Sequence, residues 1–168
     1  MKDHAALGLA PPSEATKVSL GVLRVASLLA DELDHELQEA TGLGLSEVLV
    51  ILQIQFAGGR LQMAELADTL VVTRGGVTRI VDRLVDGGYL ARVPSENDRR
   101  VIFAQVTEQA DQFIVDAQPV FEAVTARRIG SLLPRPELAA LHSTMHRLSC
   151  DNPGWQPPAS VAAQHGHD

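Results

Sequence analysis

Apolar residues near the start of the chain recur at the spacing of an α-helix. Across residues 17–40 they fall three or four positions apart and share one face: Val18, Val22, Val25, Leu29, Leu33 and Leu37. Glycines within residues 41–44 suit the C-terminus of this helix. Because so long a helix presents more apolar surface than a small core can cover, we expect part of it to contact a second copy of the chain.

Shorter helical patterns follow up to residue 60. Ser46 is expected to cap a helix that ends at Gly58 and Gly59. The inward face of this helix is predicted to carry four apolar residues: Val48, Leu49, Leu52 and Phe56.

Two further short helices are predicted between residues 61 and 85. Residues 61–70 form the first, with Leu66, Ala67 and Leu70 inside. Thr73 is expected to cap the second, which runs to about Val85 before two glycines. Two short helices joined by a turn of two or three residues are typical of a helix-turn-helix.

The periodicity then changes to that of β-strands. Residues 89–93 and 101–106 are short β-type runs, separated by a polar connection that contains proline and asparagine. This pattern predicts a β-hairpin with a long tip. A hairpin directly after a helix-turn-helix makes a winged helix-turn-helix.

The C-terminal part returns to helical spacing. Thr107 is expected to begin a helix that passes through Pro119, where it should kink or break, and a last helix covers about residues 136–148. The fold class is therefore mainly α with a small β-hairpin. We expect a flexible arm over residues 1–16, dimerisation helices over 17–45 and 108–149, a winged helix-turn-helix over 46–107 and a disordered tail over 150–168.

Charge is distributed unevenly along the chain, whose formal net charge is −7. Residues 71–107 carry six arginines against four acids, a net charge of +2, whereas the remainder carries −9. Attraction to phosphate depends on the local field more than on the total. The acidic total is therefore compatible with DNA binding, provided that the acidic parts face away from the DNA.

The candidate DNA-binding residues lie on the second helix of the helix-turn-helix and on the hairpin tip. An exposed edge of arginine, threonine and glycine suits the major groove, because arginine can fork onto guanine, threonine can reach a base edge and glycine permits a close approach. The helix candidates are Thr73, Arg74, Gly75, Thr78 and Arg79. At the tip, Arg99 and Arg100 suit the minor groove or the phosphates, and Asp98 is expected to pair with an arginine and fix the tip.

These motifs resemble the winged-helix core of the MarR family of regulators. The resemblance extends over about residues 18–148 and rests on Leu66-Ala67, residues 73–84, residues 88–90, Asp98-Arg99-Arg100 and Val106-Thr107. It implies that Asp98 and Arg100 brace the wing, that Arg99 or Arg100 reaches the minor groove, and that the helix candidates occupy recognition positions. The sequence departs from the family pattern at Gly75-Gly76, where polar residues are commoner.

The resemblance also implies a homodimer that binds a pseudo-palindromic DNA site, commonly as a repressor. Members are often released by a small molecule, frequently phenolic, which would bind between the dimerisation helices and the winged domain. Oxidation sensing through a cysteine near the first helix is not expected, because the one cysteine is Cys150. Zinc sensing is the alternative, with His142 and His146 spaced i, i+4 and His35 as a third ligand, and with His165 and His167 as weaker candidates.

Other classes of protein fit the sequence less well. A phosphate-binding glycine loop, a nucleophile elbow and a His-Glu-x-x-His motif are all absent from the sequence, so an enzyme, a catalytic residue or a cofactor is not expected. A winged-helix adaptor that binds protein would not need arginines at the wing tip. Apolar runs are too short to span a membrane and no signal pattern opens the chain, so we expect a cytoplasmic protein.

Overall fold

The structure is a computed structural model that describes residues 11–69, 74–95, 98 and 101–150. Helix α1 spans Glu14–Thr41 and begins inside the expected N-terminal arm. The cause is Ser13, whose hydroxyl oxygen accepts a hydrogen bond from the Thr16 backbone N–H at 3.2 Å and so caps the helix. The helix ends as expected at Gly42, which has a φ of 79° and donates its N–H to the Gln38 carbonyl.

Helix α2 spans Leu45–Phe56. The predictions of its cap and of its buried face were wrong in part. Ser46 lies inside the helix and does not cap it; the carboxylate of Asp34 on α1 accepts from the Leu45 N–H at 2.8 Å instead. The buried residues of α2 are Val48, Val50, Ile51 and Ile54, whereas Leu49 and Phe56 are exposed. The buried face differs from the expected one because α2 packs against α1, α4 and α5 together.

The segment after α2 is a strand followed by a helix, where one helix was expected. Strand β1 covers Arg60–Gln62 and helix α3 covers Met63–Thr69. The backbone reaches the strand through Gly58 and Gly59, both at positive φ, and β1 then pairs with β3. A strand of three residues is too short to show an alternating pattern, so the sequence did not reveal it.

Helix α4 covers Arg74–Asp86, and the β-hairpin follows it as expected. Strand β2 covers Leu90–Pro94 and β3 covers Ile102–Val106; the antiparallel sheet has the order β1-β3-β2. Leu90 pairs with Val106 and Pro94 with Ile102 at the two ends of the hairpin.

Helix α5 covers Glu108–Thr125 and runs through Pro119 as one element. A π-helical turn, η2, covers Ala126–Gly130. The last helix, α6, covers Arg135–Cys150. Thus the helical pattern is interrupted after α5 and not at the proline.

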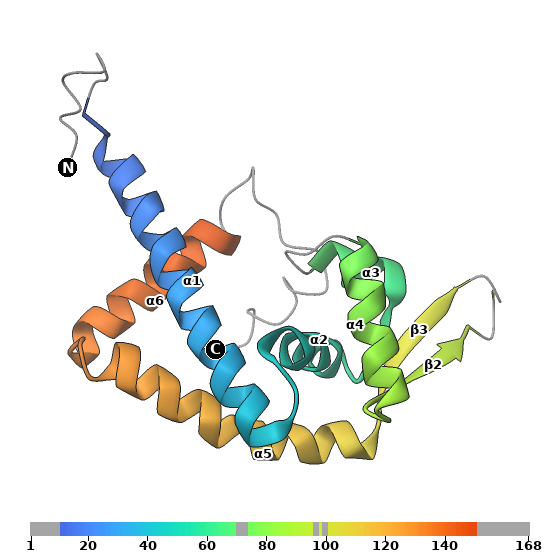
Figure 1. Cartoon of the computed structure of the whole chain (residues 1–168). Helices are drawn as coiled ribbons and strands as arrows, with labels where there is room; N and C mark the ends of the chain where they lie inside the picture. Colours follow the sequence, from blue (N-terminus) through green and yellow to red (C-terminus); the bar gives the residue numbers. More distant parts are fainter. Residues whose placement is uncertain (1–10, 70–73, 96–97, 99–100, 151–168) are drawn as a thin grey trace.

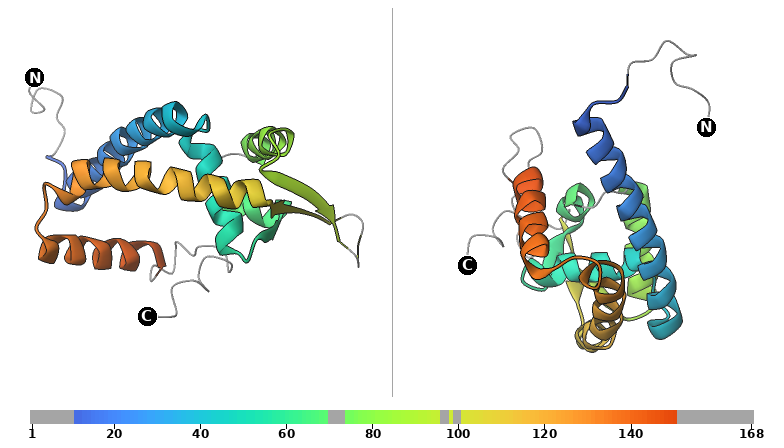
Figure 2. Two further views of the ribbon diagram at one scale, coloured as in Figure 1. Left: turned by 90° about the horizontal axis from the view of Figure 1, so that it is seen from below. Right: turned by 90° about the vertical axis from the view of Figure 1, so that its left-hand side faces the viewer.

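Two parts of the molecule lie next to each other and are joined along α5, which extends from the α6 side to the hairpin (Figures 1 and 2). We call α2, β1, α3, α4, β2 and β3 the winged domain, and α1, α5, η2 and α6 the helical frame. The two share one continuous core, to which the frame contributes Leu33, Leu37, Ala110, Phe113, Ala117 and Val124. In Figure 2 the hairpin projects beyond the rest of the winged domain, on the side remote from α6.

Within the described residues, no single helix is long and apolar enough to cross a membrane. Helices α1 and α2 reach the required length and composition only as a pair that is bent by 85°.

Candidate nucleic-acid interface

Helix α4 buries one side and exposes another. Val77, Val81 and Leu84 are at most 1% exposed and pack into the core, as the sequence predicted. Thr78 and Arg79 are exposed on the other side. Arg74 and Gly75 lie in the first turn of the helix, and Thr73 lies outside the described residues. The sequence-predicted edge is thus an exposed helix surface at Thr78 and Arg79.

Two arginines of the basic segment are paired with carboxylates. Arg92 on β2 contacts Asp82 on α4, with 2.6 Å between Nη2 and Oδ1. Arg83 on α4 pairs with Glu47 on α2. The charge count over the sequence treated these arginines as available to phosphate, and nothing in the one-dimensional pattern identified their partners.

The hairpin carries the wing residues. Beyond the β2–β3 ladder, the Ser95 N–H donates to the Val101 carbonyl and the Val101 N–H donates to the Asp98 carbonyl, both at 2.9 Å. Asp98 is exposed at the tip. Arg99 and Arg100 lie outside the described residues, so the reach of their side chains stays a prediction from the sequence.

Thr107 joins the hairpin, the turn after α4 and the start of α5. Its hydroxyl donates to the carbonyls of Gly88 at 2.8 Å and Tyr89 at 3.1 Å, and the same oxygen accepts from the Ala110 N–H at 3.4 Å to cap α5. Tyr89 also packs edge-on against Phe113 of α5, with ring centroids 5.4 Å apart. The end of α4 and the start of the wing are therefore fixed to the helical frame.

A cluster of ion pairs crosses the helical frame. Arg127 contacts Glu32 at 2.5 Å and Glu36 at 2.8 Å, and the Nε of Arg128 contacts Glu32 at 2.5 Å. The hydrogen bonds from Arg128 and Arg127 lower the pKa of the Glu32 carboxyl. The bonds from Glu32 and Glu36 raise the pKa of Arg127. These contacts join η2 to the middle of α1.

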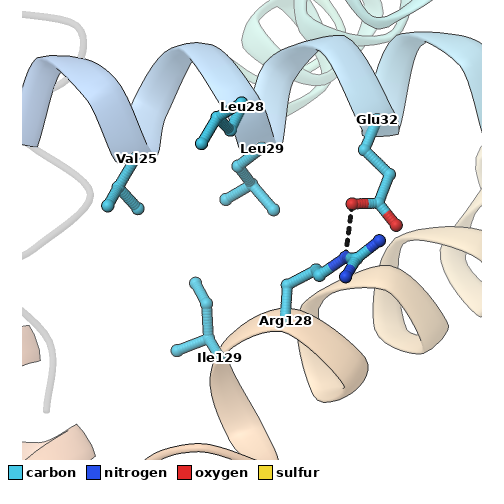
Figure 3. Close-up of a pocket in the computed structure, with 6 residues that line it drawn as sticks. All are labelled: Val25, Leu28, Leu29, Glu32, Arg128 and Ile129. Atoms are coloured by element: carbon cyan, nitrogen blue, oxygen red, sulfur yellow. Dashed lines mark hydrogen bonds and ion pairs between the residues drawn. The ribbon is translucent and has the colours of Figure 1, made fainter.

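Two mainly apolar cavities border the frame. One, of about 390 Å³, lies between α1 and η2, with Val25, Leu29 and Ile129 on its apolar walls and the Arg128–Glu32 pair at one end (Figure 3). The other, of about 340 Å³, lies between α2 and α5 and includes Phe56 and Phe121. The second cavity lies between α5 of the frame and α2 of the winged domain.

The described histidines do not form a metal centre. His142 and His146 lie on α6 and His35 lies on α1, where it is 3.6 Å from Glu39. Across the described residues, no group of three or more histidine, cysteine, aspartate or glutamate side chains could hold a metal ion. His165 and His167 are outside the part of the chain that the structure describes.

Comparisons with known proteins identify the winged-helix core. The sequence model of the MarR family matches residues 41–101, which include β1, α3, α4 and β2. This part of the winged helix-turn-helix is therefore similar to that of the MarR family. This agrees with the resemblance found in the sequence.

Relatives and solved structures extend the similarity beyond this core. The chain is 28% identical over 109 residues to the transcriptional repressor MdtR of Bacillus subtilis, a match covering 65% of this chain and 70% of MdtR. It is 22% identical over 102 residues to the regulator YkoM of the same organism, covering 60% of this chain and 66% of YkoM. Both relatives are named as transcriptional regulators.

The solved structures share the whole fold. The MarR-family regulator Sco3205 of Streptomyces coelicolor superposes with a TM-score of 0.73 at 22% identity, covering 89% of this chain and 96% of Sco3205. The organohalide-sensing regulator RdhR-CbdbA1625 superposes with a TM-score of 0.69 at 17% identity, covering 86% and 88% of the two chains. The frame helices therefore belong to the shared fold together with the winged domain.

Proposed function

We propose that this protein is a sequence-specific DNA-binding transcriptional regulator, acting as a homodimer and most simply as a repressor. The observation that carries the proposal is the exposed edge of α4 at Thr78 and Arg79, next to a projecting hairpin that Thr107 anchors at its base. A helix of this kind inserts into the major groove while the wing follows the neighbouring minor groove. The related fold of Sco3205 was solved in complex with DNA, which supports this arrangement.

The homodimer is supported by the exposed apolar surface of the frame. The first half of α1 exposes large apolar side chains that no other part of the described chain covers: Val18, Leu20, Val22, Leu23, Val25 and Leu28. Helix α6 exposes Leu141 and Leu148 and has no buried residue among those described. Most of the stability of a helix in a protein comes from packing of its apolar face, and a large exposed apolar patch marks an interface. A second copy covers both surfaces in this proposal.

A small-molecule effector is the second part of the proposal. The cavity between α2 and α5 touches both the winged domain and the frame, so a ligand there would change the position of α4 relative to the dimer axis. Its walls are mainly apolar, and Gln55, Gln118 and Glu122 are the polar residues that line it. An apolar ring with a hydroxyl group fits this lining, and RdhR-CbdbA1625 was solved with 2,4-dichlorophenol bound.

The test begins with the wild-type protein and DNA from upstream of its own gene. Footprinting should show protection of two half-sites about one turn of DNA apart. Affinity should fall steeply between about 50 and 200 mM salt. Addition of a chlorophenol should weaken the footprint if the effector proposal is right, and zinc should not.

Arg79→Ala and its matched control test the site itself. Arg79→Ala should weaken DNA binding by about 1–3 kcal/mol, whereas Arg24→Ala, which removes an exposed arginine of α1, should leave affinity almost unchanged. The double substitution Arg99→Ala, Arg100→Ala tests the wing in the same assay. Equal affinity of the Arg79 and Arg24 variants would contradict the proposed interface, and a protein partner without a footprint would favour an adaptor.

A further inference from the structure

Asp82 places a negative charge on the edge of α4 that the proposed function assigns to DNA. It follows Thr78 by four residues and Arg79 by three, so the three side chains lie on one side of the helix. About half of the Asp82 side chain is exposed. A carboxylate beside the phosphates weakens binding by repulsion, so its presence there requires a compensating role.

Arg92 supplies the partner from the wing. It is the third residue of β2, on the same face of the sheet as the buried Leu90, because alternate strand residues point to one side. Its cross-strand partner on β3 is Ala104, which is fully buried. From this position the guanidinium reaches back to α4 and contacts the Asp82 carboxylate at 2.6 Å.

The ion pair adds a point of attachment between α4 and the hairpin beyond those at the base of the hairpin. At the base, the Tyr89 N–H donates to the Leu84 carbonyl, Gly88 has a φ of 81°, and the Thr107 hydroxyl donates to the Gly88 and Tyr89 carbonyls. Because these bonds lie at the base, they leave the outer part of the strands freer to swing relative to the helix. The contact between Asp82 and Arg92, farther from the turn, restrains that swing.

We propose that Asp82 and Arg92 are positioning residues for DNA binding. Their ion pair holds the wing at the angle to α4 at which both reach the same stretch of DNA, and neither side chain needs to contact DNA. This inference rests on the proposed function. It also explains why Arg92, an arginine of the basic segment, is paired with a carboxylate of the protein itself.

The proposal and simple electrostatics predict opposite changes in DNA affinity for one substitution of Asp82. If Asp82 only repels phosphate, Asp82→Asn should tighten DNA binding. If Asp82 positions the wing, the same isosteric change should weaken it. The expected loss is bounded by the strength of a half-exposed ion pair, which corresponds to about twofold to fivefold in affinity.

Arg92 provides the complementary test through salt dependence. An arginine that contacts phosphate contributes about one unit to the slope of log affinity against log salt. For a positioning residue, Arg92→Gln should lower affinity by the same twofold to fivefold with the slope unchanged. Arg92→Lys should retain most of the affinity, because lysine keeps the charge that pairs with Asp82.

The experiment uses the full chain and DNA that the wild-type protein selects from a random pool. Affinity is measured over a salt series for Asp82→Asn, Arg92→Gln, their double variant and Arg92→Lys, and thermal unfolding checks that each is folded. The double variant should bind no worse than either single variant, since both remove one interaction. Glu137→Gln, an exposed position on α6, controls for the loss of one negative charge.

The outcomes separate this inference from the proposed function. Failure of the wild-type protein to select any DNA sequence would overturn both. Normal selection with unchanged or tighter binding by Asp82→Asn would overturn the positioning role alone. A reduced salt slope for Arg92→Gln, or additive losses in the double variant, would assign Arg92 to direct phosphate contact.

Discussion

The winged domain and the helical frame differ in how far their large apolar side chains are buried. In the winged domain, Leu61, Leu66 and Leu84 are buried within the single chain. In the first half of α1, Leu20, Leu23 and Leu28 are between 59% and 66% exposed. The apolar residues of the winged domain are thus buried within one chain, in a core to which the frame contributes, whereas the first half of α1 leaves its large apolar residues uncovered. A substitution in the core should therefore lower stability at any protein concentration, and one in the first half of α1 should act through association.

The largest expected effect comes from the core of the winged domain. Leu84→Ala removes a fully buried side chain and should lower the free energy of unfolding by about 2–5 kcal/mol. Urea unfolding followed by circular dichroism measures it. The loss should be the same at low and high protein concentration once the dimer is accounted for; a loss that disappears at high concentration would mean that the core around Leu84 is not complete in one chain.

Substitutions on the exposed apolar surface of the frame should weaken dimer association and leave the folding of the single chain almost unchanged. Leu23→Asp places a charge on a side chain that is 66% exposed, so folding of the monomer should be little affected. Two such charges at a dimer interface should weaken association by about 2 kcal/mol or more, roughly thirtyfold. Sedimentation velocity over a concentration series measures this change.

Arg24→Ala, at the next position and also exposed, is the matched control for Leu23→Asp. A dimer of unchanged affinity in the Leu23 variant would place the interface elsewhere on the molecule. Loss of folded monomer in that variant would instead show that α1 needs its first half for the core of a single chain.

The junction between the two regions should give an intermediate effect. Thr107→Val keeps the shape of the side chain but removes the cap of α5 and the bonds to Gly88 and Tyr89, so unfolding should become easier by about 1–2 kcal/mol. Thr144→Val removes a hydroxyl that bonds only to the Ala140 carbonyl of its own helix. Thr144→Val should lower the free energy of unfolding far less than Thr107→Val. An equal loss in both variants would show that the Thr107 bonds do not stabilise the junction.

The sequence predicted the parts of the fold that depend on local patterns. The helical periodicity of α1 and α4, the glycine at the end of α1 and the start of a helix at Thr107 are all confirmed, because each depends on neighbours within a few residues. Strand β1 was missed since its three residues are ordered by pairing with β3, more than forty positions away in the sequence. The Ser46 cap was wrong because Asp34, from another helix, supplies the acceptor.

The candidate site likewise has features that local sequence patterns predicted and features that only tertiary packing determines. The exposed edge of α4 follows from helical periodicity, and the structure confirms that Thr78 and Arg79 are exposed. The pairing of Arg92 with Asp82 and of Arg83 with Glu47 depends on how α4 packs against β2 and α2. Charge counted along the sequence cannot distinguish an arginine that is paired within the protein from one that is available to DNA.

The smallest effect concerns the ion pairs within the frame and depends on pH. Bonds from Arg128 and Arg127 lower the pKa of Glu32 in the folded protein. The folded state therefore binds the proton less readily than the unfolded state, and stability rises with pH through this range. The contribution is present above the ordinary carboxyl pKa and is lost as the pH falls through the lowered value.

Glu32→Gln measures that contribution. The variant should be slightly less stable than the wild-type protein at neutral pH, and the gap should close in acid as Glu32 of the wild-type protein becomes protonated. Urea unfolding at a series of pH values gives the two curves, with Glu137→Gln on α6 as the control. Because these side chains are partly exposed, added salt should narrow the gap as well. A gap that persists unchanged at low pH would mean that the introduced glutamine disturbs packing between α1 and η2, and that the ion pairs do not stabilise the frame.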